Sequence, residues 1–256
     1  MIVNYELNPP KILPNKYFDH SRLYYDIETV KKKIRLIEKY VNGIHFTDSV
    51  LGVPRLSSIT MTSIIKKFVN TVKISCSVRT RDRNFTSMYQ LVTDSILLEI
   101  DSLLILLGDE SIDGPKNNNP LKPSQFVSES NKNGFTKHIK MNLSFPNKIK
   151  NYNLINQKIA AKPYAFVTQS IQSLNELGNI VDFVKPFNIK VIACIMLPSE
   201  KNKRSANAIG LDWKEYEKEP IDFINHAGKL ADEVLLTSPN HFSLAENLLK
   251  TLRSYG

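Results

Sequence analysis

The sequence has few of the residues that mark several protein classes. Its 256 residues include only two cysteines and nine glycines. Cys76 and Cys194 form no Cys-x-x-Cys pair, and each lies in an apolar, β-branched run, so the sequence predicts small core residues rather than a disulfide scaffold or a zinc knuckle. The five histidines show no ligand spacing such as His-x-x-x-His, which argues against a metal site.

Glycine-rich phosphate loops and long hydrophobic runs are also missing. Neither Gly-x-Gly-x-x-Gly nor Gly-x-x-x-x-Gly-Lys-Ser/Thr occurs, so no dinucleotide fingerprint or P-loop is predicted. The longest apolar stretch, Ile96 to Leu107, is interrupted by Glu99 and Asp101, whereas a membrane span needs about 20 consecutive apolar residues. The N-terminus lacks the features of a signal peptide. The sequence therefore predicts a cytoplasmic protein that does not enter a membrane.

The balance of charge is positive, with 34 Lys and Arg against 25 Asp and Glu and a formal net charge of +9. Such a balance suggests an anionic partner, which could be nucleic acid, an anionic membrane or a small polyanion. The basic residues are spread over helical-looking segments and are not regularly interleaved with aromatics, so most of them are expected on solvated helix faces. We therefore expect a small-molecule partner and neither nucleic acid nor membrane.

The main structural signal is a regular alternation of apolar runs with amphipathic stretches. The run Val191–Leu197 is continuously apolar, which is typical of a strand covered on both faces. Eight segments are predicted as strands: Ile2–Leu7, Gly43–Thr47, Thr71–Ser77, Ser102–Leu107, His138–Ser144, Tyr164–Gln169, Ile189–Leu197 and Glu233–Thr237. Between them, apolar residues recur at three and four positions, as in Ile27, Val30, Ile34 and in Phe85, Met88, Val92, which indicates helices.

Eight strand–helix units in about 250 residues are the size expected of a (β/α)8 barrel. The sequence therefore predicts a single barrel domain over residues 1–256, with a doubly wound open sheet as the competing architecture. One long irregular stretch runs from Asp109 to Gly134, directly after a predicted strand. In a barrel this stretch would be an active-site loop.

Polar residues at the carboxyl ends of the predicted strands are candidates for chemistry, because a barrel displays these positions in its mouth. They are Glu6, Thr47, Asp48, Ser77, Asp109, Ser144, Thr168, Gln169, Ser199, Thr237 and Ser238. Glu6 follows an apolar strand and precedes Pro9-Pro10, so burial could raise its pKa and make it a proton donor. The competing interpretation of Glu6 is a solvated turn carboxylate.

Three further features bear on binding. Gly108 allows a tight turn that would project Asp109 toward a hydrogen-bonding ring. The Gln169 amide can donate and accept, which suits the edge of a pterin or flavin, although it could equally begin a helix. The loop Arg79–Phe85 contains three arginines and could bind a phosphate.

Taken in order, these strand ends resemble the methylenetetrahydrofolate reductase family of flavin-dependent barrels. The matching segments are Tyr5–Pro10, Asp48–Ser57, Cys76 with Arg81–Asn84, Leu106–Asp109, Phe145-Pro146, Phe166–Gln169, Ile195–Pro198 and, more weakly, Leu236–Asn240. The sequence departs from the family's pattern at Lys73, Leu107, Phe145 and Ala160, and several of these positions contact flavin in the family.

The resemblance implies a flavin, FAD or alternatively FMN, that takes electrons from NAD(P)H or reduced ferredoxin, or from a partner protein. The reduced flavin would pass hydride to 5,10-methylenetetrahydrofolate or a related pterin to give the 5-methyl form. By the same resemblance Glu6 would be the general acid, Asp109 would be catalytic and would contact both flavin and pterin, and Gln169 would bind the pterin. The implied cofactor-binding residues are Thr47, Asp109, Arg81, Asp82, Arg83, Asn84 and Phe145.

Two other functions remain open at this point. The chain could be a barrel subunit that has lost flavin and serves a larger one-carbon complex without catalysis. It could also be an unrelated barrel that acts on a phosphorylated substrate through its basic loops. The sequence leaves open whether the chain forms a homo-oligomer.

Overall fold

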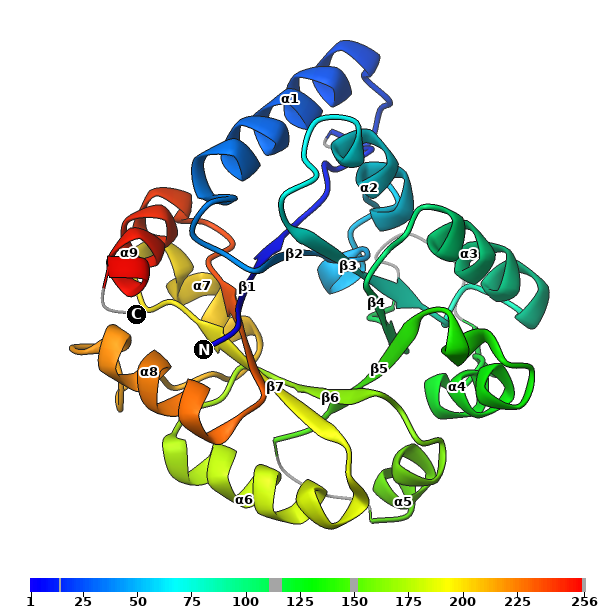
Figure 1. Cartoon of the computed structure of the whole chain (residues 1–256). Coiled ribbons are helices and arrows are strands. Elements are labelled where there is room, and N and C mark those ends of the chain that lie inside the picture. The colour runs from blue at the N-terminus through cyan, green and yellow to red at the C-terminus, as the bar shows by residue number, and fades with distance from the viewer. Residues whose placement is uncertain (14, 111–116, 148–151, 255–256) are drawn as a thin grey trace.

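Eight parallel strands close into a barrel in the computed structural model, which describes residues 1–13, 15–110, 117–147 and 152–254 (Figure 1). The strands pair in chain order, and β8 pairs with β1. Their bounds are β1 Val3–Leu7, β2 Gly43–Phe46, β3 Lys73–Arg79, β4 Ser102–Leu106, β5 Lys140–Phe145, β6 Ala165–Thr168, β7 Lys190–Met196 and β8 Glu233–Thr237. The predicted single-domain (β/α)8 barrel is confirmed.

Helices follow the strands and surround the barrel (Figure 1). They are α1 His20–Ile37, α2 Ser58–Lys66, α3 Phe85–Leu97, α4 Pro123–Lys132, α5 Tyr152–Ala160, α6 Leu174–Val184, α7 Glu200–Ala208, α8 Pro220–Leu230 and α9 Phe242–Ser254. Short 3-10 turns occupy η1 Val50–Gly52, η2 Phe135–Lys137 and η3 Lys185–Phe187. None of the helices in the described part of the chain is long and apolar enough to cross a membrane.

The predicted strands overlap the observed ones, with differences at their ends. The eighth strand has the predicted bounds, but β3 begins at Lys73 rather than Thr71 because its pairing with β2 starts at Lys73. His138, predicted to lie in a strand, instead follows the η2 turn, and β5 begins two residues later. At both of these strands, apolar or β-branched residues precede the first paired residue. Composition alone therefore does not show where a strand begins.

The predicted irregular stretch from Asp109 to Gly134 contains helix α4, which shortens the candidate loop. Pro123 stands in the first turn of α4, where its missing N–H leaves no helical hydrogen bond unmade. Phe126, Val127 and Ser130 form the buried face of this helix. Residues 111–116, within this predicted irregular stretch, lie outside the described residues.

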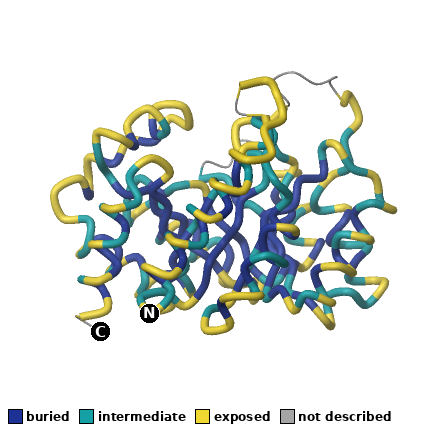
Figure 2. Tube along the Cα trace, turned by 90° about the horizontal axis from the view of Figure 1, so that it is seen from above, coloured by how far each residue is buried: buried dark blue, intermediate teal, exposed yellow. Residues whose placement is uncertain are grey.

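Alternation along the strands divides the core into two parts. Side chains that point outward pack against the helices. Both cysteines are buried, as predicted. Side chains that point inward include an apolar layer across the bore. Figure 2 shows that the segments at the centre of the molecule are mostly buried. This bore layer consists of Leu104, Ala165, Val167, Ile192 and Leu235.

His45 is a buried imidazole on the opposite, more polar side of the bore. Its Nδ1 lies 2.8 Å from Ser75 Oγ and its Nε2 lies 2.8 Å from Ser77 Oγ. Burial lowers the pKa of His45 to about 4. The ring is therefore neutral in the folded protein at pH 7, and its two serine contacts satisfy both nitrogens.

The depressed pKa of His45 predicts a loss of stability in mild acid. The unfolded chain takes up a proton near pH 6.5 and the folded chain does so only near pH 4, so stability falls as pH decreases through this window. The free energy of unfolding should fall by about 2 kcal/mol more in the parent than in His45→Gln between pH 7 and pH 5. Urea titrations at both pH values measure this difference, and parallel losses in the two proteins would contradict the assignment.

Candidate functional site

A cavity of about 750 Å³ opens at the carboxyl ends of the strands. Glu6, Cys194 and Thr237, on β1, β7 and β8, line its inner part. Segments after β1 and β2, together with α1, line its outer part. We call this cavity the carboxyl-end pocket. Its position is the one at which barrel enzymes bind their substrates.

Glu6 provides a carboxyl group that burial keeps from ionising easily. Desolvation raises the pKa of Glu6, and the hydrogen bond that Thr237 Oγ1 donates to Glu6 Oε1 at 2.8 Å opposes this rise only in part. Burial, with the nearby charge of Glu6, also raises the pKa of the Cys194 thiol to about 12. The inner pocket is therefore suited to hold a proton on Glu6, whereas the Cys194 thiol is not activated as a nucleophile.

The outer wall of the pocket is basic. Lys11, Arg22, Lys33 and Arg55 line it, and Asp26 is the acidic residue that lines the pocket besides Glu6. Arg22 pairs with Asp26 at 3.1 Å. Burial lowers the pKa of Lys33, and the charge of Asp26 opposes this shift. The wall carries an excess of positive charge, which favours an anionic ligand.

Arg55 is held with one donor unused. Its Nη1 donates to the Pro9 carbonyl at 2.7 Å, whereas its buried Nε has no hydrogen-bond partner among the residues that the structure describes. Burial lowers the pKa of this guanidinium. A buried charged donor without a partner is costly, and an oxygen of a bound ligand would satisfy it.

Asp109 lies beside the carboxyl-end pocket and holds one of its loops. The backbone N–H of Leu51 donates to Asp109 Oδ2 at 2.8 Å. Leu51 and Ser49 have positive φ values of 57° and 47°, so the loop after β2 has an unusual backbone that this contact helps to fix. Asp109 is exposed and reaches the pocket through Leu51, not directly.

The arginine-rich loop after β3 bonds mainly to the protein itself. Asp48 Oδ2 accepts from the Arg79 N–H at 3.0 Å and from Arg83 Nη1 at 2.9 Å. Arg79 also pairs with Asp82. Arg81 Nε donates to the Gly108 carbonyl at 3.0 Å. These contacts join the loops after β2, β3 and β4 into one network.

Asn84, at the end of the same loop, caps a helix. Its side chain accepts from the Ser87 N–H, and Ser87 Oγ accepts in return from the Asn84 N–H, so the two residues form a capping box at the start of α3.

The remaining predicted site residues are separated from one another. Thr47 Oγ1 donates to Asn8 Oδ1 at 2.7 Å, beside the carboxyl-end pocket. Gln169 is exposed and lines a second cavity of about 730 Å³, which shares Ser170 and Ile209 with the first. Phe145 is buried against Phe166 and Phe183 in the outer core and does not line either cavity.

Sequence reasoning missed the basic wall. Lys33 belongs to a helix whose charges were expected on a solvated face, and no local pattern shows that it faces a pocket. Arg55 lies in a loop, and its burial depends on the carbonyl of Pro9, which is distant in sequence. Thr237 was among the polar strand ends, but its partner Glu6 is on the other end of the chain, and only barrel closure brings the two together.

Comparisons with known proteins give the fold but no family. No family model and no curated protein matches the sequence. Similar solved structures include an aldolase called QR15, at TM-score 0.55 and 14% identity over 96% of this chain and 94% of that one. A tetrameric deoxyribose phosphate aldolase from Aeropyrum pernix gives TM-score 0.57 and 12% identity, over 99% and 90%. The tryptophan synthase alpha chain of Legionella pneumophila subsp. pneumophila gives a TM-score of 0.55 and 9% identity, over 99% of this chain and 90% of that one.

The predicted membership of the methylenetetrahydrofolate reductase family is wrong. The similar barrels are aldolases and a tryptophan synthase alpha chain, and no family model supports the resemblance. The predicted reductase activity, the FAD or FMN cofactor, the NAD(P)H or ferredoxin donor, the folate substrate and the flavin-free one-carbon subunit are therefore withdrawn. The matched motifs are short and fall at strand ends, where any such barrel places turns and polar residues.

The contacts of two sets of predicted flavin-binding residues agree with this correction. The phenylalanine expected at the flavin, Phe145, packs in the outer core. The side chains expected at the flavin phosphate or ribose, in Arg81–Asn84, instead connect neighbouring loops or, in the case of Asn84, cap α3.

Gly108 has the positive φ that a tight turn requires, at +83°, and it also lies against Arg79. A Cβ at this position would come within 2.5 Å of Arg79 Cγ, so an alanine would displace the arginine that joins the loops. Gly134 has nearly the same φ, +80°. None of the described atoms lies within 4 Å of the position that a Cβ would occupy there. The two glycines therefore separate backbone strain from the contact with Arg79.

We expect Gly108→Ala to lower the free energy of unfolding by about 2–3 kcal/mol and Gly134→Ala by about 1 kcal/mol. Both variants carry the cost of the left-handed backbone, and only the first moves Arg79. Denaturant titrations compare them directly. Equal losses would show that the Arg79 contact adds nothing.

Proposed function

We propose that this chain is an enzyme that uses general acid–base catalysis on a small phosphorylated molecule in the carboxyl-end pocket. The observation that carries the proposal is the pairing of a desolvated carboxyl, Glu6, with a basic pocket wall. Among the functions left open by the sequence, an unrelated barrel acting on a phosphorylated substrate agrees best with this arrangement.

Glu6 is proposed as the acid or base. A glutamate carboxyl with its ordinary pKa is almost entirely ionised at neutral pH and is a poor proton donor. Burial raises the pKa of Glu6 toward the working pH. General acid–base catalysis is most effective when the pKa of the catalytic group lies near that pH. The hydrogen bond from Thr237 fixes one carboxyl oxygen and leaves the other to face the substrate.

Arg55 is proposed as the principal ligand of the phosphate. A guanidinium donates in a fixed fork that matches phosphate oxygens, and Arg55 Nε is a buried donor without a partner within the described ranges of the chain. Lys11 and Lys33 add positive charge around it. Because the cavity of Gln169 shares residues with the carboxyl-end pocket, we further propose that Gln169 contacts a more distant part of the substrate.

Asp109 is proposed to position the pocket, not to react. Its carboxylate holds the N–H of Leu51, which lines the pocket wall. The strand lysines of the described residues, Lys73, Lys140 and Lys190, each begin their strands and so lie at the opposite end of the barrel. Imine chemistry on a strand lysine in the mouth therefore has no support from this structure, although the similar solved structures include aldolases.

Replacement of Arg55 should weaken phosphate binding. We expect Arg55→Met, titrated with inorganic phosphate and with glycerol phosphate, to bind about ten- to a hundredfold more weakly than the parent, because a charge-assisted hydrogen bond is lost. The control is Arg253→Met, an exposed arginine in the last turn of α9, which should bind as the parent does. Calorimetry measures all three proteins.

Unchanged phosphate affinity in the Arg55 variant would contradict the assignment of Arg55. Acetate separates phosphate recognition from a general preference for anions. Acetate that binds as tightly as phosphate would show that the pocket selects negative charge only.

Replacement of Glu6 should slow proton transfer strongly. We expect the parent to exchange a carbon-bound hydrogen of at least one member of a panel of sugar phosphates in deuterium oxide, followed by proton NMR. Glu6→Gln should slow this exchange about 10²–10⁴-fold while phosphate affinity is retained, because the amide cannot transfer the proton. Exchange at the parent rate in the Gln variant, or a lysine adduct trapped by borohydride, would contradict acid–base catalysis by Glu6.

A further inference from the structure

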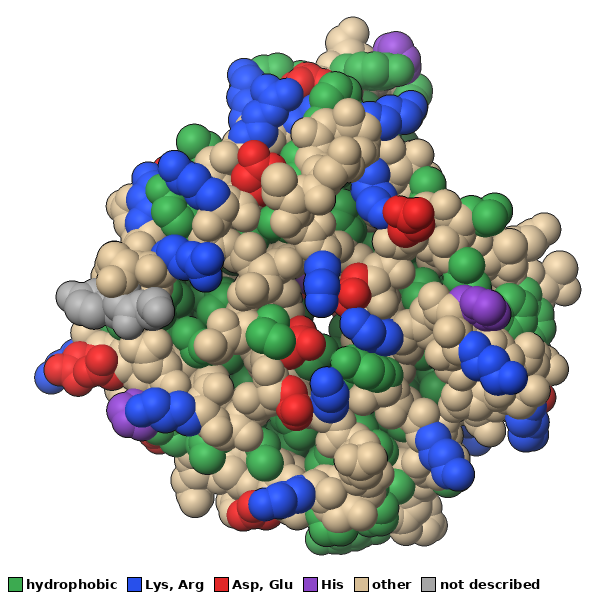
Figure 3. All heavy atoms as spheres, in the orientation of Figure 1, with side chains coloured by type: hydrophobic (Ala, Val, Ile, Leu, Met, Phe, Trp, Pro, Cys, Tyr) green, Lys and Arg blue, Asp and Glu red, His purple; other side chains and the backbone are tan. Residues whose placement is uncertain are grey.

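A third, smaller cavity enters the barrel from the amino ends of the strands. In the view of Figure 3, acidic and basic side chains gather around a hollow at the centre of the barrel. The cavity beneath has a volume of about 140 Å³, which is room for about five water molecules at about 30 Å³ each. We call it the amino-end pocket. Barrel interiors are normally filled by layers of bulky side chains, so this space is unusual.

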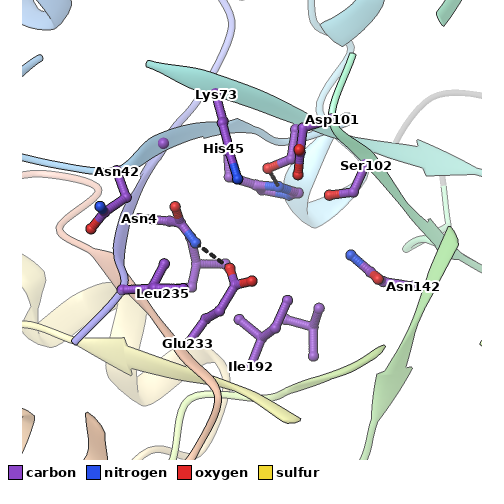
Figure 4. A pocket seen from close by; sticks show the side chains of 14 residues that line it. Asn4, Asn42, His45, Lys73, Asp101, Ser102, Asn142, Ile192, Glu233 and Leu235 are labelled. Atoms are coloured by element: carbon purple, nitrogen blue, oxygen red, sulfur yellow. Dashed lines mark hydrogen bonds between the residues drawn. The ribbon is translucent and has the colours of Figure 1, made fainter. Parts of the chain in front are cut away.

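The two sides of the amino-end pocket differ in character (Figure 4). One side, from β1 to β5, carries small or polar residues, among them Gly43, Ser75 and Ser102. The other side carries apolar residues of the bore layer, Ile192 and Leu235. An occupant that matches both sides has a short apolar part and a polar part.

Asn142 provides an amide without a partner. It is 3% exposed, it projects from β5 into the pocket, and its buried Oδ1 accepts no hydrogen bond from the described part of the chain (Figure 4). The neighbouring imidazole of His45 cannot satisfy this amide, because both ring nitrogens are already engaged by Ser75 and Ser77. A buried amide without a partner is unfavourable unless something in the pocket donates to it.

Glu233 and Lys73 supply opposite charges at the pocket. Asn4 Nδ2 donates to Glu233 Oε2 at 2.7 Å, and the other oxygen of Glu233 has no partner among the described residues. Lys73 is exposed where β3 begins, and its ammonium also has none. Asp101 is compensated by Lys140 at 3.1 Å, so it leaves no net charge. Among the residues that line the pocket, the charges that remain are the carboxylate of Glu233, which also interacts with the charge of Lys190 outside the pocket, and the ammonium of Lys73.

Gly43 keeps Asn4 in place for this arrangement. A Cβ on Gly43 would come within 2.6 Å of Asn4 Oδ1 and 3.1 Å of the Lys73 carbonyl. Any larger residue would therefore push Asn4 from its contact with Glu233. The orientation of the Glu233 carboxylate thus depends on a glycine at the first position of β2.

We propose that the amino-end pocket binds a free α-amino acid with a short apolar side chain. The ammonium of the ligand donates to Glu233, its carboxylate pairs with Lys73, its side chain lies against Ile192 and Leu235, and the Asn142 amide faces it from β5 on the opposite side of the pocket. The bore layer separates this pocket from the carboxyl-end pocket, so the ligand is distinct from the substrate proposed above.

Calorimetric titration with L-alanine and L-valine tests the proposal. Both amino acids should bind saturably, with a dissociation constant in the millimolar range or below. Methylammonium and acetate each carry only one of the two charges, so they should bind at least about tenfold more weakly. Absence of binding by both amino acids, or equal binding of methylammonium, would overturn the proposal and leave a pocket filled by water.

Two variants locate the binding site. Glu233→Gln should weaken alanine binding about ten- to a hundredfold, because a charge-assisted contact is lost. Asn142→Leu removes the amide at similar volume and should abolish binding while the protein stays folded. The control Glu200→Gln changes an exposed acid at the start of α7, at the carboxyl end of the barrel, and should bind alanine as the parent does.

Full alanine affinity in both pocket variants would overturn the proposed site. Arg55→Met separates the two pockets, since it should lose phosphate affinity and keep alanine affinity. Loss of both affinities in this variant would overturn the independence of the amino-end pocket.

Discussion

Closure of eight parallel strands is the constraint on which the rest of this structure depends. Closure brings β8 beside β1, and so places Thr237 against Glu6 although the two residues lie at opposite ends of the sequence. The same closure directs alternate side chains of every strand into one narrow bore. A carboxyl, an imidazole and several amides thereby lie in a region that the protein shields from water. In such a region pKa values shift, and an unpaired hydrogen-bonding group costs more free energy than it does in water.

The bore is divided by its apolar layer into two chemically different ends. Toward the carboxyl ends, Glu6 is desolvated beneath a wall of basic side chains. This arrangement favours an anion at the basic wall and a proton on the Glu6 carboxyl. Toward the amino ends, one acid and one base face an unpartnered amide. Asp48, Asp82 and Asp109 meanwhile hold the loops around the mouth through Arg79, Arg83 and Leu51. Most charges of these loops stabilise the shape of the pocket, which explains why a motif rich in arginine need not bind a ligand.

The sequence predicts the fold well because the signal for it is repeated along the chain. Eight apolar runs alternate with amphipathic helices, and the error of two residues at β3 or β5 does not alter that pattern. The family assignment failed for a related reason. Short motifs at strand ends reflect the architecture that many barrels share, and a resemblance based on them measures the fold more than the chemistry. Glu6 could be singled out because a carboxyl follows an apolar strand and precedes two prolines. Arg55 and Asn142 could not, because the unpaired state of each depends on neighbours from distant segments.

The pKa of the Glu6 carboxyl tests the central claim most directly. Carbon NMR of protein labelled at the glutamate carboxyl carbons, titrated in parallel for the parent and for Glu6→Gln, identifies the resonance of Glu6 by its absence from the variant. We predict that this resonance titrates above 4.5, because desolvation outweighs the hydrogen bond from Thr237. A Glu6 carboxyl that titrates at or below 4.5 would be ionised at neutral pH like an exposed glutamate, and it would contradict the proposed acid–base role.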